Sequence, residues 1–221
     1  MNGWRTALAA AAALLALPSA GRSGELRGVV EYGGPVPRLA PIPVTKDHGT
    51  CGESQPDESL VTAGGRLANV VVQVKGAPGS PARLVLGQDR CRYRPHVLAA
   101  PVGSTLAFAN GDPVLHNVHG YRVKATAFNL AMPQQGQQSA PRKLDRPGPV
   151  RVRCDVHGWM GAWVVATEGP AAVSASDGTF AIAGLPPGNW TVTAWHETLG
   201  ERTLEVKVPA EGTVTASFRF E

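Results

Sequence analysis

Three residues within one short stretch carry side chains suited to binding a soft metal ion. Cys154, His157 and Met160 lie within seven residues, directly after a β-branched run at 150–153 that is typical of a strand. A thiolate, an imidazole and a thioether together select copper, or less often zinc. A turn at a strand end can aim Cys154 and His157 at one ion. Such a site still needs a further imidazole from elsewhere in the chain.

A second segment supplies that imidazole. Residues 108–119 read FANGDPVLHNVH and follow a predicted strand, with His116 near their end. With both segments in place, the sequence resembles the cupredoxins, the plastocyanin and azurin family of blue copper proteins. The resemblance covers residues 81–168. It rests on pieces in a fixed order, namely Thr105–Phe108, Asn110, Asp112, His116-Asn117-Val118, Pro147–Cys154, His157 and Met160.

The resemblance implies one copper ion that cycles between Cu(I) and Cu(II) in electron transfer. Its ligands in the plane would be His116, Cys154 and His157, with Met160 as a weak axial ligand, which is the set expected of an electron-transfer copper site. Asn117 would form a hydrogen bond across to the loop that carries Cys154. Hydrogen bonds of this kind orient the ligands and tune the metal.

Two features depart from the family pattern. Only two residues separate His157 from Met160, where familiar members have four, so Met160 is either drawn closer to the ion or misses it. His119 should point to the opposite side of its strand from His116, but it becomes an alternative ligand if the chain turns after Val118. Two other interpretations stay open: a zinc site, or ordinary packing of a thiol, a turn histidine and a methionine.

The remaining cysteines, Cys51 and Cys91, are predicted to form a disulfide. The chain has three cysteines, and an exported protein keeps such a bond in oxidising surroundings. The bond would tie the loop at 47–57 to the first strand of the copper-binding region. The alternative is a second metal site built from His48, Cys51, Cys91 and His96. Without such a site, these two histidines are surface or packing residues.

Short apolar runs, separated by Gly, Pro, Asn and Asp, make up most of the chain after its N-terminal segment. No helical period is convincing there, so the pattern predicts an all-β protein built of packed sandwiches. The predicted strands are 26–32, 68–75, 82–86, 96–100, 105–109, 150–154, 162–166, 179–183, 190–195, 203–208 and 213–220.

The C-terminal part carries a second resemblance. Residues 177–192 read DGTFAIAGLPPGNWTV and resemble the second half of a carboxypeptidase-regulatory-like (transthyretin-like) β-sandwich, while 28–32 and 69–76 fit its first half. We therefore predict a discontinuous sandwich of residues 24–80 and 169–221, into which a cupredoxin Greek-key sandwich at 81–168 is inserted. The alternative is a separate C-terminal domain packed beside the cupredoxin.

The N-terminus has the layout of a secretory signal peptide, which we place at residues 1–23. Arg5 precedes the apolar run Ala7–Leu17, and small residues follow. The run is too short to span a bilayer permanently. We expect an exported chain, periplasmic or extracellular at the cell envelope, without an integral membrane span after cleavage. An uncleaved N-terminal anchor is the alternative.

Composition and missing motifs narrow the function further. The net charge is +4 and the 21 Lys and Arg residues are scattered, which argues against a nucleic-acid partner. The chain holds no G-x-S-x-G, H-E-x-x-H or phosphate loop, and Trp195-His196-Glu197 fits an ordinary surface pair, so we expect no enzyme. We expect a one-electron carrier that serves unidentified redox partner proteins. Copper handling, or an envelope binding module that works through its regulatory-like sandwich, are the alternatives.

Overall fold

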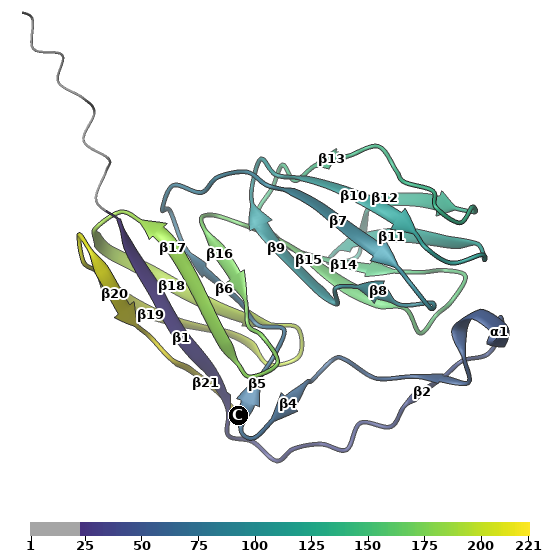
Figure 1. Ribbon diagram of the computed structural model, residues 1–221, viewed down its shortest axis with the longest axis horizontal. Helices are drawn as coiled ribbons and strands as arrows, with labels where there is room; N and C mark the ends of the chain where they lie inside the picture. The colour runs from purple at the N-terminus through teal and green to yellow at the C-terminus, as the bar shows by residue number, and fades with distance from the viewer. Residues whose placement is uncertain (1–22) are drawn as a thin grey trace, which may run out of the picture.

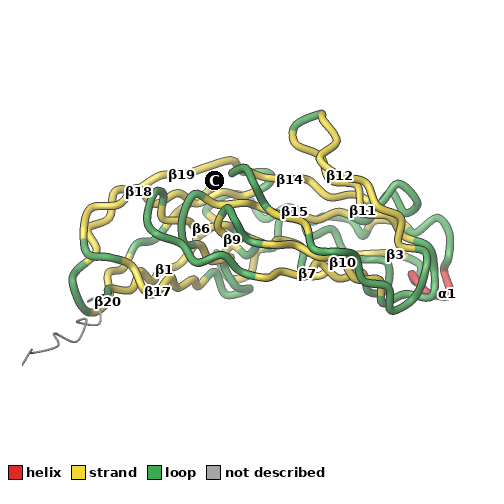
Figure 2. Tube along the Cα trace, turned by 90° about the horizontal axis from the view of Figure 1, so that it is seen from above, coloured by secondary structure: helices red, strands yellow, loops and turns green. Residues whose placement is uncertain are grey.

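The computed structural model describes residues 23–221, and this part of the chain is nearly all β (Figure 1). The predicted signal peptide lies outside the described residues, apart from its last position. Two bodies of strands follow one another along the long axis of the molecule (Figure 2). Each body consists of two sheets around its own apolar core, which confirms the predicted all-β class. Within residues 23–221, no helix has the length and hydropathy of a membrane span.

We call the first body the terminal sandwich, because both ends of the described chain belong to it. Its strands are β1 (Gly24–Tyr32), β4 (Thr62–Ala63), β5 (Arg66–Leu67), β6 (Val71–Val74), β16 (Ala171–Val173), β17 (Thr179–Leu185), β18 (Gly188–His196), β19 (Gly200–Val208), β20 (Gly212–Thr215) and β21 (Phe218–Phe220). One sheet has the order β17-β1-β5-β4, with β20 and β21 also paired to β1, and the other has the order β16-β6-β18-β19. Leu26, Val72 and Phe180 meet in the core between them.

The strand predicted at 213–220 is two strands in the structure. Both β20 and β21 run parallel to β1. The regular strand is interrupted between them, where the N–H of Ala216 donates to the carbonyl of Arg27 at 3.0 Å. Ala216 is also buried in the core of the terminal sandwich. The alternation of the sequence continues through this interruption and therefore gave no sign of it.

The second body, the central sandwich, holds the segments with candidate metal ligands. Its strands are β7 (Arg83–Gln88), β8 (Tyr93–Arg94), β9 (Val97–Pro101), β10 (Thr105–Asn110), β11 (His116–Arg122), β12 (Ala125–Met132), β13 (Arg142–Lys143), β14 (Gly148–Arg153) and β15 (Gly161–Thr167). The sheet orders are β13-β10-β7-β8 and β12-β11-β14-β15-β9. Leu86, Phe108 and Val152 lie in the core between the two sheets, and β10 alternates inward and outward along its whole length.

A long excursion connects the two bodies. Residues 33–61, here called the strap, leave the end of β1 and run to the far end of the central sandwich before they return to β4 (Figure 1). The strap carries β2 (Ile42–Pro43), the short helix α1 (His48–Cys51) and β3 (Ser54–Gln55). A disulfide joins Cys51 to Cys91 with a Cα separation of 5.1 Å, which confirms the predicted bond.

The disulfide leaves no support for the alternative set of His48, Cys51, Cys91 and His96. His48 lies on the surface of the strap, with Nδ1 at 3.2 Å from the carbonyl oxygen of Gly52. His96 faces the terminal sandwich instead. The two histidines therefore behave as the surface and packing residues that the sequence allowed.

The two sandwiches meet through apolar and polar contacts. Val71, Val97 and Val165 form a small core of their own, and the rings of Trp163 and Trp195 lie edge to face beside it, with centroids 5.2 Å apart. The predicted boundaries at 80/81 and 168/169 stay a prediction. The same is true of the regulatory-like identity of the terminal sandwich.

The segment 195–197 is not the surface pair that its sequence suggested. His196 is buried, and burial lowers its pKa to about 4, so the ring is neutral near pH 7. Glu197 accepts a hydrogen bond from Trp163 Nε1 at 2.6 Å and pairs with Nε2 of His96. The carboxylate of Glu197 thus faces the central sandwich, because the two bodies pack against one another at this point, while His196 packs near Phe220 within the terminal sandwich.

This contact predicts a pH dependence of stability. Burial opposes the charged form of His96, but the hydrogen bond and negative charge of Glu197 outweigh it and raise the pKa of His96 above its ordinary 6.5. A raised pKa in the folded state means that the stabilisation is complete below the unfolded pKa and is lost as pH rises through the folded pKa. Urea denaturation should show the free energy of unfolding falling by about 1–2 kcal/mol between about pH 6 and about pH 9, relative to Glu197→Gln. Parallel curves for the two proteins would contradict this.

Candidate metal centre

Three candidate ligands meet at one end of the central sandwich. His116 begins β11, Cys154 follows the last residue of β14, and His157 lies in the turn that leads into β15. Because β11 and β14 are antiparallel neighbours, the start of β11 and the end of β14 lie at the same end of the sheet. The ligand atoms of all three residues lie within 4.8 Å of one another, and all three side chains are buried.

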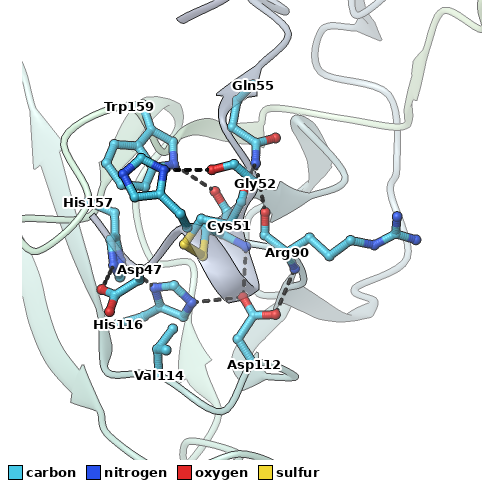
Figure 3. Close-up of a disulfide and its surroundings, with 12 residues drawn as sticks. Asp47, Cys51, Gly52, Gln55, Arg90, Asp112, Val114, His116, His157 and Trp159 are labelled. Carbon is cyan, nitrogen blue, oxygen red and sulfur yellow. Dashed lines mark hydrogen bonds and ion pairs between the residues drawn. A yellow bond between two sulfur atoms is a disulfide. The ribbon is translucent and has the colours of Figure 1, made fainter. Parts of the chain in front are cut away.

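The two imidazoles face each other through the same ring atom. Nδ1 of His116 lies 2.8 Å from Nδ1 of His157, and each Nε2 lies 2.8 Å from a carboxylate oxygen, of Asp112 and of Asp47 respectively (Figure 3). An ionised carboxylate only accepts hydrogen bonds, so each Nε2 carries the proton and each Nδ1 presents a lone pair. In two neutral rings these lone pairs would face each other, an arrangement that a metal ion or one further proton stabilises.

The thiol of Cys154 completes the group. Its Sγ lies 3.9 Å from Nδ1 of His157, and it accepts the backbone N–H groups of Asn117 at 3.5 Å and of His157 at 3.4 Å. These two donors fix the position of the sulfur. The pocket thus offers one cysteine sulfur and two imidazole nitrogens, a donor set that suits copper and is also acceptable to zinc.

The pKa shifts at the site favour a neutral His116 and an ionised Asp47. Burial lowers the pKa of His116, against the opposing effect of its hydrogen bond to Asp112. The hydrogen bond from His157 lowers the pKa of Asp47 and keeps that carboxyl group ionised. Metal ligands must be deprotonated at the binding atom, and carboxylates behind histidine ligands fix the tautomer, so the arrangement suits a metal.

The hydrogen bond expected of Asn117 is present. Its Oδ1 accepts the backbone N–H of Asp155 at 2.6 Å, and its Nδ2 donates to a carboxylate oxygen of the same residue at 2.9 Å. From the core side, the hydroxyl of Tyr93 donates to the carbonyls of Asn117 at 2.6 Å and Arg153 at 3.0 Å. Burial raises the pKa of Tyr93, so this donor stays protonated. These bonds join the start of β11 to the loop of Cys154.

Met160 closes the short turn and lies in the same core. Its N–H donates to the carbonyl of His157 at 2.9 Å, and its own carbonyl accepts the N–H of Cys154 at 3.4 Å. The side chain is almost completely buried. The short spacing of two residues between His157 and Met160 therefore produces a tight turn. The role of the thioether as an axial ligand stays a prediction.

His119 faces away from the three-donor group. Its Nδ1 lies 2.9 Å from a carboxylate oxygen of Asp155, its Nε2 lies 2.9 Å from Thr126 Oγ1, and its ring stacks on Tyr121 at 4.0 Å. His116 and His119 are three positions apart on one strand, so their side chains leave opposite faces of the sheet. In the described part of the chain, His119 belongs to no group of three clustered donors.

Three residues at the site had no assigned role in the sequence. Asp112 lies in the quoted motif, but its contact with His116 depends on the turn after β10. Trp159 packs on His157 with ring centroids 5.0 Å apart and donates from Nε1 to the carbonyl of Cys91 at 3.2 Å. Asp47 lies 110 positions from His157, so nothing in the local sequence relates the two.

Comparisons with known proteins add weak similarities. No family model matches the chain, and no curated protein matches it either. Similar solved structures include a copper-containing nitrite reductase from Thermus scotoductus SA-01, at 19% identity and a TM-score of 0.35, which covers 49% of this chain but only 25% of the reductase.

Two smaller proteins are matched over nearly their whole length. A purple cupredoxin from Nitrosopumilus maritimus, at 21% identity and a TM-score of 0.32, covers 39% of this chain and 99% of its own. The match to amicyanin from Paracoccus versutus, at 19% identity and a TM-score of 0.34, covers 43% of this chain and 96% of amicyanin. At these scores the likeness carries no argument about function, which rests on the geometry above.

Proposed function

We propose that this chain is an exported mononuclear copper protein that carries one electron at a time. His116, Cys154 and His157 would hold the ion and Met160 would approach it along the axis. One observation carries the proposal: two buried imidazoles bring their Nδ1 atoms to 2.8 Å from each other while each Nε2 lies against a carboxylate, and a thiol lies 3.9 Å from one of the rings.

Bound copper would supply the Cu(I)/Cu(II) couple. The chain's own residues would hold the ligands in one arrangement for both oxidation states, because Asp112 and Asp47 fix the two rings and backbone donors fix Cys154. Burial of all three donors keeps bulk water from the ion. The proposal assigns no enzymatic activity to the chain.

The direct test is a spectrum of the exported chain after Cu(II) addition and removal of excess metal. We expect an intense visible absorption and a copper–thiolate EPR signal from one ion per chain. A protein that holds no copper, or that holds zinc in preference with no visible band, would contradict the proposal. Titration with both metals distinguishes the two failures.

Met160 offers a test of the axial position. We expect Met160→Leu to shift the reduction potential without emptying the site, because a weak fourth ligand tunes the potential and its loss leaves the other three ligands in place. Leu has a similar volume, so the core should tolerate it. Protein-film voltammetry and copper analysis measure the two effects. An unchanged potential would remove Met160 from the ligand set.

Copper handling is the second candidate, and the strap is the observation that favours it. His157 is completely buried and its outer nitrogen is covered by Asp47 of the strap, so the strap lies between this ligand and an approaching partner. A covered ligand suits retention and regulated release of an ion. In that function the redox couple is incidental.

The strap carboxylate separates the two candidates. We expect Asp47→Ala to speed transfer of copper to a chelator by about tenfold, because His157 loses the partner that orients its ring. Glu53→Ala is the matched control, since this strap carboxylate is exposed and pairs with His48. Stopped-flow transfer to a chelator measures the rate. Equal rates for wild type and Asp47→Ala would favour the electron carrier.

The cellular setting belongs to the same proposal. A buried disulfide between Cys51 and Cys91 suits an oxidising compartment, in keeping with the N-terminal segment that resembles a secretory signal. We propose a periplasmic or extracellular location and one or more redox partner proteins of unknown identity. Fractionation with detection of the processed N-terminus tests the location.

A further inference from the structure

The Cys51–Cys91 disulfide lies directly against the candidate metal centre (Figure 3). The sulfurs of Cys51 and Cys91 and a ring nitrogen of His157 lie within 4.8 Å of one another, and all three residues are buried. Cys91 forms a further such group with Asp112 and His116. A disulfide that only anchored the strap could lie anywhere along the central sandwich. This one places two sulfurs beside the imidazoles of the candidate metal centre.

The two cysteines are held together by more than their bond. Gln55 Nε2 donates to the carbonyl of Cys51 at 2.5 Å and to that of Arg90 at 3.0 Å. The carboxylate of Asp112 accepts the backbone N–H groups of Arg90 at 2.7 Å and Cys91 at 2.8 Å. If the disulfide opens, these bonds still keep both thiols beside the imidazoles.

The backbone at this contact adopts an unusual conformation. Asp47, Arg90 and Cys91 have φ angles of 54°, 47° and 55°, in the left-handed region that residues other than Gly seldom enter. Such conformations persist where surrounding contacts impose them, and they concentrate at functional sites. Here they turn the strap and the segment between β7 and β8 toward the same buried point.

A surface cleft leads to the disulfide. It has a volume of about 440 Å³, and Cys51 lines it together with Arg90, Arg92 and Arg94. The arginines of the cleft are paired with Asp89 and Glu58, so most of its charge is balanced. Cys51 is the member of the disulfide that lines the cleft, so a low-molecular-weight thiol or dithiol would approach the bond from this side.

We infer that Cys51 and Cys91 form a second, disulfide-gated site for Cu(I). A dithiol reductant supplies two electrons and two protons: the S–S bond breaks, both cysteines become thiols, and the reductant becomes a disulfide. Cu(I) then binds to the two thiolates, with His157 as the third donor, and the two thiol protons leave. Thiolates select Cu(I) over harder ions. Because His157 belongs to both groups, the pair would adjoin the deeper site directly.

The inference depends on the proposed function only for the choice of metal, and the experiment separates the two. The full chain carrying Cys154→Ser loses the deeper thiolate and keeps the pair. It is titrated with Cu(I) under nitrogen against a bicinchoninate indicator, once oxidised and once after phosphine reduction and desalting. We expect binding to rise by about one equivalent upon reduction.

Two controls make the result decisive. The same reduced protein with Cys51 and Cys91 alkylated by iodoacetamide should bind no more Cu(I) than the oxidised protein, as should Cys154→Ser combined with Cys51→Ser and Cys91→Ser. If the triple variant does not fold, as judged by circular dichroism, the alkylated protein serves alone. No Cu(I) bound by reduced Cys154→Ser, or equal binding by reduced and alkylated protein, overturns the inference while leaving the deeper site untouched.

Discussion

Cys154→Ser is expected to reduce the visible absorption of the copper-loaded protein at least about tenfold. The colour of such a site arises from a bond between a thiolate and Cu(II), and Cys154 is the thiol that faces the two imidazoles. A serine hydroxyl occupies less space and stays protonated near pH 7, so it is a poor replacement as a ligand. The fold should survive, because the change is nearly isosteric. Absorption, EPR and circular dichroism measure the three consequences.

A matched control distinguishes this effect from general damage to the sheet. His119→Gln alters an imidazole on the same strand as His116, but one that contacts Asp155 and Thr126 on the opposite face. It should leave the band within about twofold of wild type. Strong colour in Cys154→Ser would remove the central assignment. Loss of colour in His119→Gln would move the ligand set toward His119.

Removal of the disulfide is expected to have the second largest effect. Cys51→Ser with Cys91→Ser should lower the free energy of unfolding by about 4 kcal/mol, since the bond closes a loop of 40 residues and restricts the unfolded chain. For a protein of this size the melting temperature should fall by about 10 °C. Urea denaturation and calorimetry give both values.

The control for this prediction is Cys154→Ser, which removes a buried thiol without opening a cross-link. Its effect in the metal-free protein should stay below about 2 kcal/mol. A double serine variant that loses no more stability than Cys154→Ser would mean that hydrogen bonds such as those of Gln55 hold the strap without help from the disulfide.

Many strands, and the placing of two donors at one turn, were predictable because their signals are local. Alternating residues define β10, and the spacing of Cys154 and His157 after β14 places both at one turn. The strand β12 was not predicted, although Phe128, Leu130 and Met132 repeat with a period of two. Ala and Asn lie between these apolar residues, and most of the strand is exposed. The pattern was therefore hard to distinguish from the loop that follows.

The sequence by itself determined the all-β class, the pair of cysteines in the disulfide and the residues whose donor atoms cluster. The class follows from short alternating runs, the disulfide from the pair of cysteines left over in a chain expected to be exported, and the donor set from residue types together with the ordered motifs that carry the resemblance. Only the tertiary structure decided that the strap covers His157, that Asp47 and Asp112 fix the two rings, and that Glu197 faces His96 across the two sandwiches. Such contacts join residues far apart in the chain, and they form because apolar burial packs the sheets and strap together, a global outcome that local spacing does not encode.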